Sequence, residues 1–336
     1  MIFIDNEGQT NPKLNLALEE YALRNFDTST DYLLFYINEP SIIIGRNQNT
    51  LEEIHLEYVE DKQIHVVRRI SGGGAVYHDL GNLNFSFITN HDGKSISNFK
   101  KFTAPVIRVL NQMGVHAELK GRNDILVNDK KISGTAQFST GKRMISHGTL
   151  LLDTNMSEVV KALQVKMSKI QSKGHKSVRS RVANITEFLK NPMTMEEFKS
   201  QLLKGLYEAS EPFETYRLTE KEWEAVHKLK AEKYDLWDWN FGRSPKFNIQ
   251  RTKRFDIGEI DIRIHVEKGH ITEIAIYGDF FGEKPVKELE ESLKGVAYNK
   301  PQLKEALSPF NINNYFSSIT NSQFLELLYG SDLDET

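Results

Sequence analysis

The stretch RRISGGGAVYHDLGN, residues 68–82, places cationic side chains beside three consecutive glycines at the end of a strand-like run. Because Gly72, Gly73 and Gly74 lack a Cβ, a ligand can approach their backbone closely, and successive N–H groups can point at one anionic oxygen. Arg69 adds a planar fork of donors that suits phosphate or carboxylate. The pattern predicts a cradle for an anion, and a glycine-rich bulge or hairpin is the structural alternative.

A second candidate is GRNDILVNDKKISGTAQ, residues 121–137, in which two lysines stand side by side. Neighbouring residues of a strand face opposite sides of the sheet, so only one lysine can face a given pocket. If Asn128 and Asp129 form a two-residue turn, Lys131 lies opposite Leu126.

This register also places Ser133 opposite Asp124, so that Lys131, Ser133 and Asp124 share one face. The other face has the composition of a core with Lys130 at its rim, since it carries Ile125, Val127 and Ile132. We therefore expect Lys131 to face a site. A three-residue turn would reverse the assignment, and a surface hairpin with solvated lysines is the alternative.

A third candidate is the segment 159–186, which contains no acidic residue but seven cations: Lys161, Lys166, Lys169, Lys173, Lys176, Arg179 and Arg181. Such a loop can close over a polyphosphate. It can also be a solvated surface loop or bind nucleic acid.

The chain has no cysteine, which excludes disulfides, thiolate metal sites and a cysteinyl thioester. No P-loop, H-E-x-x-H, EF-hand or G-x-S-x-G motif occurs. The ten histidines show no metal-ligand spacing. Acyl chemistry in this chain would therefore need activation by another route.

The elements that must position these residues form an α+β pattern with a mostly antiparallel sheet. Apolar spacing predicts helices at 12–25, 51–62, 98–113, 157–163, 184–190 and 194–208. Strands are expected at 31–37, 41–46, 64–70, 81–88, 116–121, 123–127, 130–138 and 143–152.

The character of the chain changes at residues 240–248, NFGRSPKFN. Two long alternating strands at 254–266 and 270–278 follow, and then helices near 285–295, 300–307 and 321–330. We expect a catalytic domain at 1–241, a linker at 242–248 and a small α+β domain at 249–336.

The 336 residues carry a net charge of −3, with 39% hydrophobic and 10% aromatic residues. This balance argues against a nucleic-acid or membrane-surface protein, since both need a basic excess. The apolar start is too short for a signal peptide, and no apolar run reaches about 18 residues. We expect a cytoplasmic monomer.

Together the three stretches resemble the lipoate–protein ligases. RRISGGGAVYHDLGN resembles the family's lipoate-binding loop, and GRND followed by KISGTA resembles the segment with its single essential lysine. HGTLLL and KSVRSRVANI resemble its sheet edge and adenylate-binding loop. WDWNFGRSPKF and VEKGHITE resemble its C-terminal accessory domain. The resemblance covers nearly the whole chain and implies a biotin/lipoate ligase-like fold.

The resemblance implies a two-step reaction. Lipoate and ATP, which travels with Mg²⁺, give lipoyl-AMP and pyrophosphate, and the lipoyl group then passes to a lysine of an acceptor lipoyl domain. Such acceptors are the glycine-cleavage H protein and the acyltransferase subunits of 2-oxoacid dehydrogenases. This route needs no enzyme nucleophile, which agrees with the missing cysteine.

The resemblance also implies roles for single residues. Lys131 matches the catalytic lysine, which contacts both the acyl oxygen and the α-phosphate, and Asp124 is a candidate magnesium ligand. The expected ATP and adenylate contacts are Arg69, Gly74, Ala75, Val76, Tyr77, Asn123, Asp124, Lys131, Ser177 and Arg179. The expected lipoate contacts are Ser71, Gly72, Gly73, His78, Lys131 and His147. Asn82 and Thr149 fall in matching motifs as secondary contacts.

Three other functions stay open on the same scaffold: a transferase that moves lipoyl or octanoyl groups between carrier proteins, a biotin ligase, and a non-catalytic acyl-adenylate sensor. Transferases that work through a cysteine acyl-enzyme are excluded, because the chain has no cysteine. The sequence does not decide the preferred acceptor, the use of octanoate or lipoamide, or the need for a relay enzyme.

Overall fold

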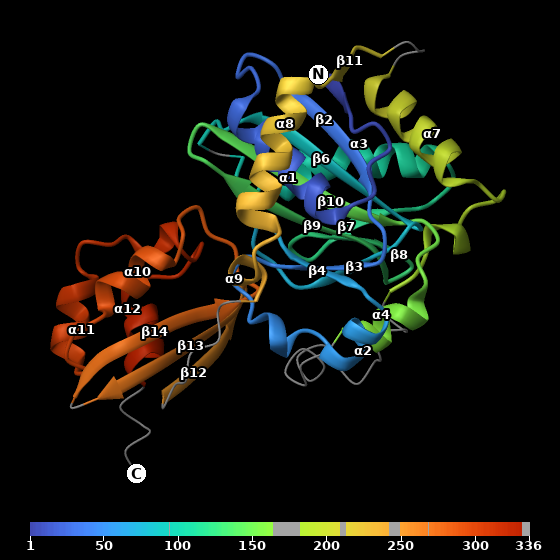
Figure 1. Cartoon of the computed structure of the whole chain (residues 1–336). Helices are drawn as coiled ribbons and strands as arrows, with labels where there is room; N and C mark the ends of the chain where they lie inside the picture. The colour runs from blue at the N-terminus through green and yellow to red at the C-terminus, as the bar shows by residue number, and fades with distance from the viewer. Residues whose placement is uncertain (94, 164–181, 209–212, 242–248, 268, 331–336) are drawn as a thin grey trace. The chain divides into compact units, whose positions relative to one another are not determined.

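A computed structural model describes residues 1–93, 95–163, 182–208, 213–241, 249–267 and 269–330 (Figure 1). The chain divides into two compact units. The first comprises Met1–Ile44, Leu51–Ile70 and Ala75–Asn240, and the second Gly45–Thr50, Ser71–Gly74 and Phe241–Thr336. The expected linker 242–248 and the candidates Ser177 and Arg179 lie outside the described residues.

The first unit is built on an eight-stranded sheet, counted over the described residues. Its order is β11 (Thr215–Arg217), β1 (Ile2–Asp5), β2 (Tyr32–Ile37), β6 (Asn82–Asn90), β10 (Arg143–Leu151), β9 (Lys130–Ser139), β8 (Asp124–Val127) and β7 (Glu118–Lys120). Strand β1 runs parallel to β11 and β2, and all other neighbours are antiparallel. The predicted α+β class with a mixed, mostly antiparallel sheet is confirmed.

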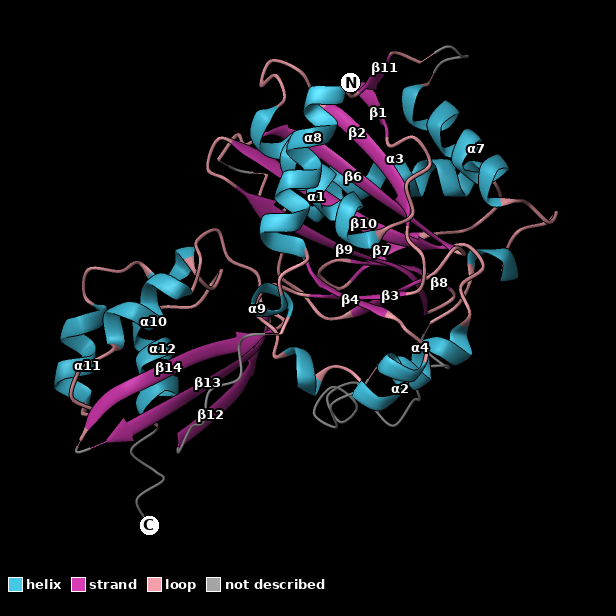
Figure 2. Ribbon diagram, viewed as in Figure 1, coloured by secondary structure: helices cyan, strands magenta, loops and turns pink. Residues whose placement is uncertain are grey.

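A smaller sheet of the first unit has the order β4 (His65–Arg68), β3 (Ser41–Ile44) and β5 (Val76–His78). Helices α1 (Pro12–Asn25) and α8 (Glu220–Leu229) share a hydrophobic core with this small sheet and with one face of the large sheet. Helices α3 (Phe99–Gln112) and α7 (Met195–Tyr207) cover the opposite face of the large sheet (Figure 2). Helix α1 begins where predicted, because the Asn11 side chain caps it and Pro12 occupies the first turn.

Two predicted helices of this unit are shorter than expected. The stretch 51–62 contains a 3₁₀ turn, Thr50–Glu52, and α2 (Leu56–Asp61), because Ile54 forms an extended β-bridge with Leu163 next to α4 (Met156–Ala162). The stretch 184–190 contains only the 3₁₀ turn Ile185–Glu187, and Pro192 follows closely. No helix among the described residues is long and apolar enough to cross a membrane.

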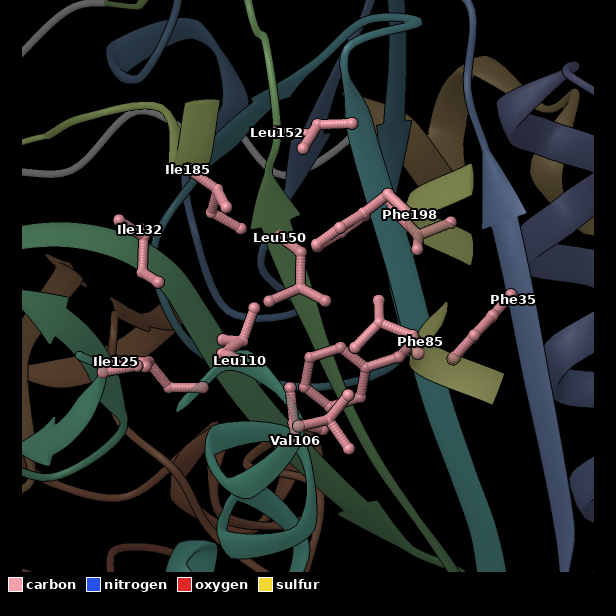
Figure 3. Packing of buried hydrophobic residues seen from close by; sticks show 14 of the residues in the cluster. Phe35, Phe85, Val106, Leu110, Ile125, Ile132, Leu150, Leu152, Ile185 and Phe198 are labelled. Atoms are coloured by element: carbon pink, nitrogen blue, oxygen red, sulfur yellow. The ribbon is translucent and has the colours of Figure 1, made fainter. Parts of the chain in front are cut away.

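Alternation along β6 divides the large sheet into an apolar and a polar face. Its residues Leu83, Phe85 and Phe87 pack against α3 and α7 in one core. Figure 3 shows Phe85 in this core with Val106 and Leu110 of α3 and Phe198 of α7. The intervening residues Asn82, Asn84 and Ser86 are buried on the face toward α1. A row of buried polar groups on this face makes it the candidate site.

The second unit contains a sheet of β12 (Ile249–Phe255), β13 (Gly258–Glu267) and β14 (His270–Gly278). Helices α10 (Lys287–Leu293), α11 (Lys300–Leu307) and α12 (Asn321–Tyr329) share its hydrophobic core. The prediction of a single strand over 254–266 is wrong, because the chain turns at Asp256 and Ile257 before Gly258, whose φ is +127°. Glycine adopts this angle at little cost.

Candidate active site

The β8–β9 hairpin has the predicted two-residue turn. Asn128 and Asp129 have φ angles of 48° and 61°, which are typical of a type I′ turn. Lys131 pairs with Leu126 as predicted, and its Nζ lies 2.7 Å from Oδ1 of Asp124. Lys130 points elsewhere, since its Nζ lies 3.1 Å from Oε2 of Glu187.

The prediction that Ser133 faces Asp124 is wrong. The register shifts between Ile125 and Leu126, so Ser133 pairs with Ile125 and Gly134 pairs with Asp124. This bulge buries Ser133 fully and brings a glycine to the position beside Lys131.

Gly134 makes room for the lysine side chain. A Cβ at this position would lie 2.8 Å from Nζ of Lys131, so the lysine lies across the bare backbone of β9. The N–H of Gly134 donates to Oγ1 of Thr149 at 3.2 Å, which ties β9 to β10. The side-chain amide of Asn123 donates to the backbone carbonyl of Thr135, and the backbone carbonyl of Asn123 accepts the N–H of Thr135. Asn123 therefore fixes the strand that carries Lys131.

His147 lies two residues before Thr149 on the same face of β10 and pairs with Ala136 of β9. Its Nδ1 lies 2.9 and 3.1 Å from the two carboxylate oxygens of Glu19 on α1. Both side chains are buried. The large sheet thus places Lys131, Thr149 and His147 on one face, with α1 above it.

Arg69 follows β4 and is buried. Its Nη1 donates to the carbonyl of Ile43 at 3.0 Å. Burial lowers the pKa of Arg69 to about 10, and the nearby Tyr36 and Glu19 act in the opposite direction. The guanidinium therefore remains a cation at neutral pH, within the electrostatic reach of Glu19.

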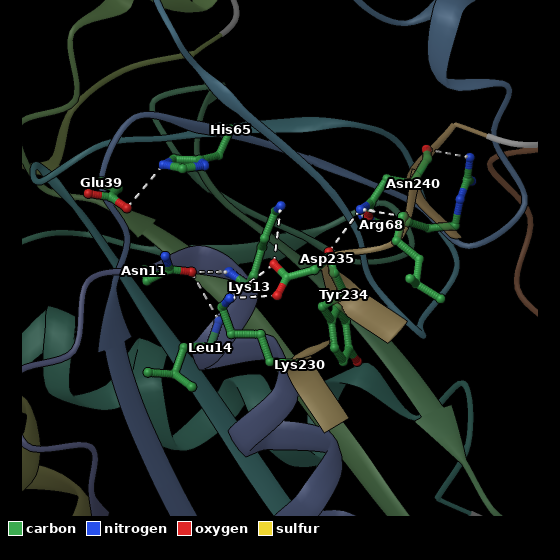
Figure 4. A network of polar contacts seen from close by, with 11 residues as sticks. Asn11, Lys13, Leu14, Glu39, His65, Arg68, Lys230, Tyr234, Asp235 and Asn240 are labelled. Carbon is green, nitrogen blue, oxygen red and sulfur yellow. Dashed lines mark hydrogen bonds and ion pairs between the residues drawn. The ribbon is translucent and has the colours of Figure 1, made fainter. Parts of the chain in front are cut away.

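Arg68, the residue before it, is held by the last two residues of the first unit, Trp239 and Asn240. Figure 4 shows its contact with Asn240. Its N–H donates to Oδ1 of Asn240 at 2.9 Å, and its Nε and Nη2 donate to the carbonyls of Trp239 and Asn240. Nε1 of Trp239 donates back to the carbonyl of Arg68 at 2.8 Å. The amide of Asn240 in turn donates to the carbonyls of Tyr234 and Leu236. These bonds fix the backbone next to Arg69.

The glycine run behaves as a packed loop. Ser71–Gly74 belong to the second unit, and the carbonyl of Ser71 accepts the N–H of Arg46 at 2.9 Å. Gly73 has a φ of +92°, and a Cβ at Gly72 would lie 2.4 Å from the carbonyl oxygen of Phe280. The positive φ of Gly73 and the close packing at Gly72 therefore account for glycine at both positions. Binding of an anion by this loop stays a prediction.

Ala75 begins the return to the first unit, and Val76, Tyr77 and His78 form β5, paired with β3. Burial raises the pKa of Tyr77 well above its ordinary value. The part of the third candidate segment that the structure describes includes Val182, which forms a β-bridge with Lys131. The next residue, Ala183, donates its N–H to the Lys131 carbonyl at 3.0 Å. The end of the third candidate segment is thus anchored at the lysine.

Sequence reasoning missed Glu19, Tyr36 and Gly134. Glu19 carried a usable signal, because it shares one helical stripe with Leu16 and Leu23 at i, i+3, i+7 spacing. A carboxylate on an apolar stripe indicates a buried partner. Gly134 carried no such signal, because the β-bulge determines which face of the sheet this residue lies on.

Comparison with known proteins defines the class. Residues 11–207 match the lipoyl protein ligase A/B catalytic domain, and residues 244–328 match the bacterial lipoate protein ligase C-terminus. The chain belongs to the lipoate–protein ligase family and is an enzyme of the ligase class.

Among its relatives, the lipoate-protein ligase LplJ of Bacillus subtilis is 55% identical over 98% of this chain and 100% of its own length. Lipoate–protein ligase 1 of Staphylococcus aureus is 50% identical, with the same coverage of each chain.

Solved structures give the same result. P. falciparum LipL1 in complex with lipoate has a TM-score of 0.77 at 26% identity and covers 98% of both chains. A bipartite lipoate protein ligase with its E2 lipoyl domain from Thermoplasma acidophilum has a TM-score of 0.64 at 32% identity, over 74% of this chain and 98% of its own. Lipoate-protein ligase A bound with ATP has a TM-score of 0.60 at 31% identity, over 69% of this chain and 94% of its own.

Proposed function

We propose that the chain activates lipoate with ATP to lipoyl-AMP and then transfers the lipoyl group to a lysine of an acceptor lipoyl domain. The observation that carries this proposal is the position of Lys131, whose Nζ is held by Asp124 across Gly134 in a chain of this family. Similarity to structures with bound lipoate and with bound ATP supports both substrates.

In the first step a carboxylate oxygen of lipoate bonds to the α-phosphorus of ATP, and the bond from that phosphorus to the β-phosphate oxygen breaks, which releases pyrophosphate. Negative charge builds on the α-phosphate oxygens, and the ammonium of Lys131 stabilises it. A preorganised donor of this kind accelerates a reaction about 10²–10³-fold.

In the second step the neutral amine of the acceptor lysine bonds to the acyl carbon and loses a proton to solvent, the bond from the acyl carbon to the phosphate oxygen breaks, and AMP leaves. Lys131 donates to the acyl oxygen as charge builds there. The enzyme forms no covalent bond to the substrate, in agreement with a chain that lacks cysteine.

Magnesium enters with ATP as part of the substrate. Within the described residues no group of three or more His, Cys, Asp or Glu side chains is placed to hold a metal ion. Asp124 can supply one oxygen to the ion, with the phosphates supplying others. The other ATP, adenylate and lipoate contacts expected from the family resemblance, including Ser177 and Arg179, are part of this proposal.

The proposed acceptors are the glycine-cleavage H protein and the acyltransferase subunits of 2-oxoacid dehydrogenases, and similarity to a ligase that has an E2 lipoyl domain as partner supports the second class. We expect a monomer that works in the cytoplasm, where its ATP is supplied. Residues 242–248 are proposed as the linker between the catalytic domain, 1–241, and the C-terminal domain, 249–336.

The test is pyrophosphate exchange into ATP with lipoate, octanoate or biotin as the acid, followed by transfer of labelled lipoate to a panel of purified acceptor domains. We expect exchange that depends on lipoate. Exchange with biotin alone would indicate a biotin ligase. Acyl transfer from a carrier protein without exchange would indicate a transferase, and binding without either reaction a sensor.

A further inference from the structure

His78 of β5 is a buried polar group with one open hydrogen-bonding atom. The residue is 3% exposed, and within the described part of the chain its Nε2 has no hydrogen-bond partner. Nearly all buried polar atoms in native proteins are paired. Whether Nε2 carries a hydrogen therefore decides whether it can donate a hydrogen bond to a ligand or accept one from it.

Three buried asparagines lead to this histidine, and backbone carbonyls fix their orientation. Nδ2 of Asn6 donates to the carbonyl of Gln9 at 3.0 Å and to Oδ1 of Asn15 at 3.1 Å. Nδ2 of Asn15 donates to the carbonyls of Gln9 and Ile37 at 2.9 and 3.2 Å. Because a carbonyl only accepts, neither amide can be flipped.

The fixed amide of Asn15 determines the orientation of the Asn38 amide, which in turn determines the tautomer of His78. Nδ2 of Asn15 also lies 2.9 Å from an amide atom of Asn38, so its two hydrogens are shared among this atom and the carbonyls of Gln9 and Ile37. Because an amide nitrogen does not accept a hydrogen bond, the Asn38 atom that faces Asn15 must be Oδ1. The amide nitrogen of Asn38 then lies 3.0 Å from Nδ1 of His78 and must donate to it. Nδ1 is therefore unprotonated, and the neutral ring carries its proton on Nε2.

The surroundings keep the ring neutral. Burial, with the charges of Arg69 and His147, lowers the pKa of His78 to about 3. His147 is itself bonded to Glu19. A neutral N–H on a ring that is within the electrostatic influence of Arg69 is suited to an oxygen with negative charge.

We propose that His78 donates its Nε2–H to an oxygen of the bound acyl-adenylate, and that Asn38 is the positioning residue that sets this tautomer. The inference rests on the proposed function for the identity of the ligand. The tautomer itself follows from the asparagine chain alone.

Asn38→Asp tests the positioning role. A carboxylate cannot donate to Nδ1, so the ring proton moves to Nδ1 and Nε2 loses its hydrogen at high pH. At low pH the ring takes up a second proton, and Nε2 donates again. We expect the KM for lipoate in pyrophosphate exchange to rise about 10-fold or more at high pH and to recover as the pH falls. A loss that does not depend on pH would overturn the role of Asn38.

His78→Gln supplies an amide near the position of Nε2, while His78→Phe has no donor. We expect the glutamine variant to keep most of the exchange activity and the phenylalanine variant to lose about 10-fold or more. In the glutamine background Asn38→Asp should have no pH-dependent effect. The same pH-dependent loss in both backgrounds would contradict the inference.

Nitrogen-15 NMR of histidine-labelled wild-type protein reads the tautomer directly, with the His78→Gln variant used for assignment. We expect Nε2 to be protonated and Nδ1 unprotonated from pH 5 to 8. A proton on Nδ1, or a normal histidine titration, would overturn the proposal even if lipoate-dependent exchange is found. Absence of exchange with the expected tautomer would instead reject the proposed function.

Discussion

Replacement of Lys131 by alanine is expected to slow lipoate-dependent pyrophosphate exchange about 10²–10³-fold, because it removes one preorganised cation from the developing oxyanion. This factor corresponds to about 3–4 kcal/mol of transition-state stabilisation. The lysine is in place before substrate binds, since its Nζ lies 2.7 Å from Asp124 and across Gly134.

The same change should leave the fold nearly as stable. The side chains of Lys131 and Asp124 are 36% and 24% exposed, and ion pairs of this kind contribute at most about 1 kcal/mol. Urea denaturation should therefore give a free energy of unfolding within about 1 kcal/mol of the wild-type value. A loss of activity with this stability separates chemistry from folding.

Lys130→Ala is the matched control. Its Nζ pairs with Glu187 at 3.1 Å, and both side chains are almost half exposed. We expect exchange within about 2-fold of the wild-type rate, as for ordinary surface changes. Equal losses in the two variants, or near-normal exchange by Lys131→Ala, would refute the assignment.

Three other predictions follow from the structure. Gly134→Ala places a Cβ 2.8 Å from Nζ of Lys131 and should displace the lysine side chain. The rate of pyrophosphate exchange should therefore fall about 10- to 100-fold, with an unchanged free energy of unfolding. A wild-type rate would contradict the placement of the lysine. Asn240→Ala removes the side-chain hydrogen bonds to the N–H of Arg68 and to the carbonyls of Tyr234 and Leu236, while the Leu236 carbonyl keeps the backbone N–H of residue 240. Urea denaturation should therefore show a loss of about 2–4 kcal/mol, and a loss below about 1 kcal/mol would be inconsistent with these bonds. Burial lowers the pKa of His78 from its ordinary 6.5 to about 3, so the unfolded state binds more protons between these values. The free energy of unfolding should therefore decrease as the pH falls through this range, by up to about 1.4 kcal/mol per pH unit. Urea midpoints from pH 7 to 4 should therefore depend less on pH in His78→Gln, and equal slopes would argue against a neutral buried ring.

Local sequence determined the features that depend on neighbouring residues. Asn128 and Asp129 tolerate positive φ angles, so the two-residue turn and the pairing of Lys131 with Leu126 could be predicted. Asn11 and Pro12 likewise fixed the start of α1. The family was also readable from sequence, because its motifs are continuous stretches of chain.

Tertiary structure alone decided the contacts between distant residues. Glu19 and His147 are 128 positions apart, and Arg68 and Asn240 are 172 positions apart. The bulge that moves Ser133 into the core and Gly134 beside Lys131 depends on how β9 fits between β8 and β10. Periodicity assigns a residue to a face only while the register is regular, and packing against other elements determines where that regularity ends.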